Sequence, residues 1–124
     1  MREDVVSNYF KMWVDRDFAK LDDIFCDCIY YRECYGATYV GLDEVHMWIN
    51  DMLLKQTVLK WEIKNCYNLD NSTIFVEWTF QAKETETYIF DGISKIRFQN
   101  NKIISIEEYE TKHNTFRPYK ILKS

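Results

Sequence analysis

Residues 3–33 read EDVVSNYFKMWVDRDFAKLDDIFCDCIYYRE, and this stretch decides the architecture of the chain. Apolar residues at positions 5, 6, 9, 10, 13 and 14 follow the spacing of one helical face, which predicts an amphipathic helix over residues 3–16. A second, short helical stretch is expected over residues 17–25, with Asp17 as its N-cap. The chain then turns extended through residues 29–33. Helix, short helix and strand therefore follow one another without a linker.

The rest of the chain changes its hydrophobic period from 3.6 to 2. A third helix is predicted from Leu42 to Lys55, preceded by a short loop or hairpin between Gly36 and Gly41. Beyond residue 56, apolar and polar residues alternate in four long runs separated by turn signals such as Asp70-Asn-Ser72. Helices followed by a meander of long strands indicate an α+β domain with helices on one face of an antiparallel sheet. Strands of this length are able to wrap into a cone around the first helix.

The composition and net charge limit the classes of function that we expect for this chain. A chain of 124 residues with 47% apolar and 29% charged residues is typical of one globular domain. Its net charge of −4 argues against a nucleic-acid surface. It opens with charged residues instead of an apolar leader, and no apolar run approaches the ~20 residues that cross a bilayer. We therefore expect a cytoplasmic protein with no nucleic-acid or membrane partner. The aromatic share of 17% predicts a core or a cavity lined with rings.

The cysteines do not follow a known redox or zinc pattern. Cys26 and Cys28 are separated by one residue, whereas the common motifs need two. Free, buried thiols are the expectation for all four cysteines in a chain with no export signal. We predict no metal site and no cofactor.

Five segments, in this order and spacing, resemble SnoaL-like proteins of the NTF2-like superfamily: residues 9–25, 41–49, 76–80, 96–98 and 101–109. The resemblance covers residues 3–111 of a single domain spanning 1–124, with 112–124 as a tail that would close the cone mouth or bind a dimer partner. It implies an NTF2-like conical barrel, with three N-terminal helices packed on the concave face of a strongly bent antiparallel sheet. It also implies a deep apolar pocket and a homodimer through the outer sheet face.

The same resemblance suggests catalytic positions. Ketosteroid isomerases of the superfamily use a tyrosine donor, a carboxylate base and a protonated aspartate. Alignment on shared positions places these roles at Tyr9, Glu33 and Ser94. Tyr9 and Glu33 suit their roles, but a serine hydroxyl is far less acidic than a carboxylic acid. Losing one such donor typically costs ~10²–10³ in rate, so steroid isomerisation itself is disfavoured.

Glu108 is a rival acid. It shares strand parity with Ile104 and Ile106, so it faces the cavity if those isoleucines do. A buried carboxylate needs a partner, for which Arg32, Arg97 and Tyr9 are the candidates.

Three hypotheses stay open. One is an enzyme of isomerase, cyclase or lyase type that uses Glu33, Tyr9 and Glu108. The second is a non-catalytic domain that shelters a small ligand, and the third is a protein-interaction domain. The first two predict a small apolar or aromatic molecule in the pocket. We expect its wall to comprise Trp13, Trp48, Met52, Trp61, Trp78, Phe80, Phe90 and Ser94.

Overall fold

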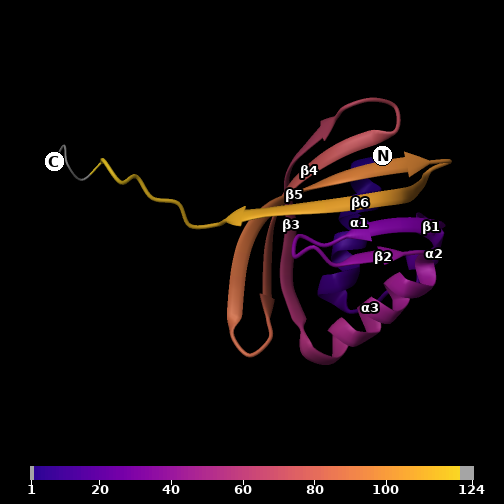
Figure 1. Ribbon diagram of the computed structural model, residues 1–124, viewed down its shortest axis with the longest axis horizontal. Coiled ribbons are helices and arrows are strands. Elements are labelled where there is room, and N and C mark those ends of the chain that lie inside the picture. Colours follow the sequence, from indigo (N-terminus) through magenta and orange to yellow (C-terminus); the bar gives the residue numbers. More distant parts are fainter. Residues whose placement is uncertain (1, 121–124) are drawn as a thin grey trace.

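A computed structural model describes residues 2–120 of the chain (Figure 1). Three helices and six strands follow one another in the order α1 (Arg2–Asp15), α2 (Leu21–Ile24), β1 (Phe25–Arg32), β2 (Thr38–Val40), α3 (Leu42–Lys55), β3 (Thr57–Asn68), β4 (Thr73–Lys83), β5 (Thr87–Gln99) and β6 (Lys102–Lys112). The predicted α+β class, the third helix and the four long strands are confirmed.

The sheet is mixed, which corrects the expectation of an antiparallel sheet. Its order is β2-β1-β6-β5-β4-β3, and β1 runs parallel to β6 while every other pair is antiparallel. The strands from β3 to β6 form the predicted meander. β1 and its hairpin partner β2 are then added at the β6 edge. β1, which precedes the meander in the sequence, is therefore the neighbour of β6, the last strand of the meander.

The second helix is shorter than the sequence suggested. Only Leu21–Ile24 is helical, and Phe25 already begins β1. Asp17 accepts a hydrogen bond from the backbone N–H of Ala19 (3.0 Å), so it closes a local turn and does not cap the helix. Competition of this kind between an aspartate side chain and the helical backbone is common in short segments.

Helices α1 and α3 lie inside the curve of the sheet (Figure 1). The predicted stripe of α1 is buried at Val6, Tyr9, Phe10 and Trp13, whereas Val14 at its end is exposed. Phe10 stacks on Trp61 of β3 with ring centroids 3.9 Å apart. After α1, Arg16 adopts a positive φ of 58° and turns the chain. Its guanidinium donates hydrogen bonds to the carbonyls of Leu53 and Gln56, at the end of α3. The ends of the two long helices are thereby joined.

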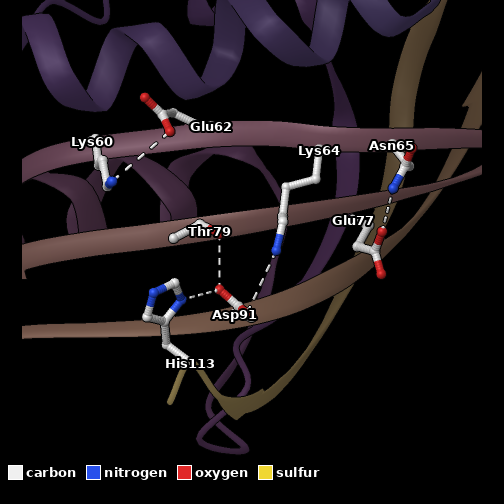
Figure 2. Close-up of polar contacts among 8 residues, drawn as sticks. All are labelled: Lys60, Glu62, Lys64, Asn65, Glu77, Thr79, Asp91 and His113. Carbon is white, nitrogen blue, oxygen red and sulfur yellow. Dashed lines mark hydrogen bonds and ion pairs between the residues drawn. The ribbon is translucent and has the colours of Figure 1, made fainter. Parts of the chain in front are cut away.

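The outer face of the sheet carries a polar network (Figure 2). Asp91 of β5 accepts a hydrogen bond from Thr79 (2.8 Å), lies 2.8 Å from Nδ1 of His113 and pairs with Lys64 at 3.7 Å. Partial burial acts in the opposite direction, but the contacts with His113 and Thr79 lower the pKa of Asp91. A homodimer through this face remains a prediction, and such an interface would have to accommodate these charges.

The start of the C-terminal tail lies on this outer face, because His113 contacts Asp91 there. The following described residues are exposed and run away from the sheet (Figure 1). Residues 121–124, the last part of the predicted tail, lie outside the described residues. Among residues 2–120, no helix has the length and apolar character needed to cross a bilayer.

Candidate functional site

A chain of hydrogen bonds crosses the interior from α1 to β6. The indole Nε1 of Trp13 donates to the hydroxyl of Tyr9 (3.0 Å), which donates to the hydroxyl of Tyr31 (2.8 Å). Tyr31 in turn donates to Oε2 of Glu108 at 2.5 Å. Both tyrosines are fully buried, and Glu108 is 8% exposed. We call these four residues the Trp13–Glu108 relay.

Burial dominates the electrostatics of the relay. It raises the pKa of Glu108 to about 8, and the nearby charge of Glu33 acts in the same direction, while the hydrogen bond from Tyr31 opposes them. Burial also raises the pKa of Tyr9 and of Tyr31. At pH 7 the Glu108 carboxyl is therefore largely protonated. The inward orientation predicted for Glu108 is what the structure has, but its direct partner is Tyr31 instead of an arginine or Tyr9.

A pocket of about 570 Å³ opens beside the relay, where α3 meets β1, β2 and the β4–β5 turn. Its lining is mixed in character, and much of it is acidic. Four carboxylates and one lysine line it together with three rings, two methionines and a glutamine: Glu33, Tyr35, Tyr39, Glu44, Met47, Trp48, Asp51, Met52, Lys55, Gln56 and Glu84.

Glu33 is the lining carboxylate whose environment perturbs it most clearly. It is half-buried and accepts a hydrogen bond from the hydroxyl of Tyr39 at 2.9 Å. Burial raises its pKa, against the effects of Tyr39, Trp48 and the charge of Lys55. The indole Nε1 of Trp48 is itself buried and has no acceptor in hydrogen-bonding geometry among the described residues. The pocket therefore holds a carboxylate bound by a phenol, beside a buried indole N–H that makes no hydrogen bond of regular geometry within residues 2–120.

Trp48 separates the pocket from the relay. Its ring lines the pocket and lies 4.9 Å, centroid to centroid, from the ring of Tyr31. It also stacks on Tyr39 (4.8 Å, 15° between planes) and contacts Trp13 (5.2 Å). One side chain thus touches both the pocket and the hydrogen-bonded interior.

The predicted wall residues divide into two groups. Trp48 and Met52 line the pocket. The others pack among themselves or in the core, and their rings fill the cone: Trp13, Trp61, Trp78, Phe80 and Phe90. Ser94 is fully buried and accepts a hydrogen bond from the indole of Trp78 (2.8 Å), so its hydroxyl has a structural partner.

The structure brings together some predicted catalytic residues but not all of them. Tyr9 and Glu108 belong to the relay, whereas Glu33 lies in the pocket. Glu108 is the cross-strand neighbour of Ser94, so a carboxylic acid stands beside the position where the resemblance placed one. Sequence reasoning missed Tyr31, although it shares strand parity with Ile29 and Glu33. It also missed Tyr39, which lies in a strand of three residues.

Among residues 2–120, no group of three or more His, Cys, Asp or Glu side chains is arranged to hold a metal ion. His46 instead lies 2.6 Å from Asp22 on the surface.

The fold defines the class of protein, which is a small α+β cone whose helices are enclosed by a curved sheet. The pocket and the Trp13–Glu108 relay lie side by side within it. The chain belongs to the SnoaL-like domain family, whose profile matches residues 6–106. No curated protein matches it.

Solved structures share the fold at low sequence identity. A protein of ketosteroid isomerase-like fold from Catenulispora acidiphila, in complex with trimethylamine, has a TM-score of 0.76 at 16% identity, over 88% of this chain and 85% of that one. An epoxide hydrolase from M. tuberculosis has a TM-score of 0.76 at 14% identity, over 86% and 80%. A steroid delta-isomerase from Pseudomonas aeruginosa has a TM-score of 0.65 at 19% identity, over 90% and 80%.

Proposed function

We propose that this protein is an acid–base enzyme for a small molecule bound in the pocket, with Glu33 as the proton-transferring group. The observation that carries the proposal is a half-buried carboxylate of raised pKa that lines a pocket of about 570 Å³. A raised pKa makes the carboxylate a stronger base, which favours proton abstraction from a bound substrate. The reaction class is proton transfer at a carbon next to a carbonyl, as in isomerisation or cyclisation.

The two carboxyl groups suit different roles. Glu33 lines the pocket and burial raises its pKa, so it supplies the base. Glu108 is largely protonated at neutral pH and accepts a hydrogen bond from Tyr31. Its role is therefore to hold the hydroxyl groups of the relay tyrosines in position. Environments that push apart the pKa values of two acids are typical of acid–base sites. Tyr39, which donates to Glu33, positions the base.

The substrate of this proposal carries a cationic amine. Four carboxylates against one lysine give the pocket a negative potential. Its rings, Tyr35, Tyr39 and Trp48, have π faces that attract an ammonium group by ~0.5–2 kcal/mol each. Trimethylamine in the complex of the Catenulispora acidiphila protein is an amine of this kind, on a shared fold. This revises the apolar ligand expected from the sequence to one with an apolar body and a charged end.

A test of catalysis uses hydrogen–deuterium exchange. A panel of small aminoketones is incubated with the protein in D₂O, and exchange next to the carbonyl is followed by NMR. Glu33→Gln should reduce exchange by ~10²–10⁴, as expected for loss of a general base. Glu44→Gln is the matched control, since it removes a carboxylate of the same pocket. Exchange that is equally fast in Glu33→Gln and the wild type would refute the role of Glu33.

Non-catalytic binding of an amine is the second candidate, and the acidic, ring-bearing lining favours it specifically. Calorimetric titration with trimethylammonium chloride separates the two functions. Binding that weakens in Glu84→Gln and at high salt, with no exchange for any ketone of the panel, would favour the binding domain over the enzyme.

A further inference from the structure

Two cysteines meet on a bulge of β1. Against β6, Phe25 pairs with Ile103 and Tyr30 with Ser105, so β1 uses five steps where β6 uses two. The additional residues form a bulge that contains Cys26 and Cys28. In a regular strand, side chains two residues apart lie ~6–7 Å from each other. On this bulge the two Sγ atoms are 2.7 Å apart.

The surroundings of the pair favour one thiolate. The thiols of Cys26 and Cys28 contact each other (2.7 Å between Sγ atoms), and the backbone N–H of Cys28 donates to Sγ of Cys26 (3.4 Å). These contacts, with a smaller contribution from Lys102, lower the pKa of Cys26. The contact with Cys26 raises the pKa of Cys28. A thiol of lowered pKa beside a second thiol is the usual arrangement of an attacking and a resolving cysteine.

Exposure and contrast with the other cysteines support the same interpretation. The expectation of buried thiols is wrong for this pair: Cys28 is exposed and Cys26 is partly exposed, so a reagent in solvent reaches them. Burial raises the pKa of Cys34 to about 12 and also raises that of Cys66. The chain thus contains two poorly reactive thiols as internal controls for the pair.

We propose that Cys26 and Cys28 form a surface dithiol that exchanges with low-molecular-weight disulfides and closes into an intrachain disulfide. The thiolate of Cys26 attacks one sulfur of the small disulfide, a mixed disulfide forms, and one small thiolate leaves. Cys28 then loses its proton to water and attacks Sγ of Cys26, which releases the second small thiolate. The two protein thiols are oxidised and the small disulfide is reduced to two thiols. The Sγ atoms need to approach by only ~0.7 Å to reach bonding distance.

The test uses oxidised glutathione and the full chain. Intact mass spectrometry of the wild type should show loss of two hydrogen atoms without a retained adduct. Peptide mapping should place the disulfide within residues 21–32, where both cysteines lie. Cys28→Ser should instead accumulate a stable glutathione adduct on Cys26. Cys26→Ser should react at least ~10-fold more slowly, because it lacks the favoured thiolate.

The matched control is the double variant Cys34→Ser, Cys66→Ser, which keeps the dithiol and should form the disulfide at the wild-type rate. Far-UV circular dichroism of each variant establishes that the sheet is intact. A stable glutathione adduct on the wild type, or equal rates for Cys26→Ser and the wild type, would overturn the proposal. So would loss of the reaction in the double variant.

Discussion

Replacing Glu108 with glutamine should remove a large part of the pH dependence of stability. The neutral amide has nearly the shape of the protonated carboxyl, and its oxygen is able to accept the hydrogen bond from Tyr31. Below pH 5 the two proteins should therefore have similar free energies of unfolding. As the pH rises, only the wild type has to ionise a carboxyl inside the core.

The magnitude follows from the pKa. Glu108 titrates near 8 in the folded protein and near 4.5 when unfolded. The folded state binds more protons than the unfolded state between these values, so stability falls as the pH increases through that window. Each unit of pKa difference corresponds to ~1.4 kcal/mol. The wild type should lose on the order of 4 kcal/mol between pH 5 and pH 9 through this one group.

Urea denaturation at pH 5, 6, 7, 8 and 9, followed by tryptophan fluorescence, measures the effect. The difference in free energy of unfolding between Glu108→Gln and the wild type should grow steadily up to about pH 8 and then level off. Glu107→Gln is the matched control, because Glu107 is the neighbour in β6 whose side chain points to the opposite face. It should leave the slope unchanged. Parallel pH profiles for Glu108→Gln and the wild type would refute the buried, protonated carboxyl.

Three further predictions concern packing around the relay and the pocket. Tyr31→Phe leaves Glu108 without its hydrogen bond and should cost ~1–3 kcal/mol of stability, measured by urea denaturation at pH 5; an unchanged midpoint would contradict the contact. Trp48→Leu should let water reach the relay, so the stability loss between pH 5 and 9 should shrink, and an undiminished loss would show that another group keeps the relay dry. Gly92→Ala places a methyl group against both the Trp78 ring and the backbone carbonyl of Tyr109 and should cost ~3 kcal/mol, seen as a lower thermal midpoint; wild-type stability would show that the ring and the neighbouring strand both shift readily.

Much of the fold could be predicted because it rests on local periodicity. The bounds of α3 agree with the sequence expectation, since Gly41 precedes it and its apolar residues keep one face. The four long strands follow from strict alternation, and the same parity placed Glu108 inside. A hydrophobic period that repeats along a helix or strand can be recognised from the sequence alone.

Pairings between distant segments could not be predicted in this way. The parallel contact of β1 with β6 depends on which edge of the meander is free, and no nearby residue encodes that choice. The partner of Glu108 was missed for the same reason, because Tyr31 reaches it across this contact. The acidic pocket is lined by Asp51 of α3 and Glu84 of the β4–β5 turn. These residues are distant in the sequence and come together only in the folded protein.

The parallel contact of β1 with β6 also has a consequence for the order in which the protein is made. β1 and β2 are synthesised before the meander, yet their only link to the other described strands of the sheet is β6, the last of these six strands in the chain. Such long-range pairing slows folding, because the intervening chain must be closed before the contact is gained. The nascent protein therefore has to hold the β1–β2 hairpin without β6 until residues 103–107, which pair with β1, have been translated. The Tyr31–Glu108 hydrogen bond, which spans this same contact, becomes possible only once β6 has been synthesised.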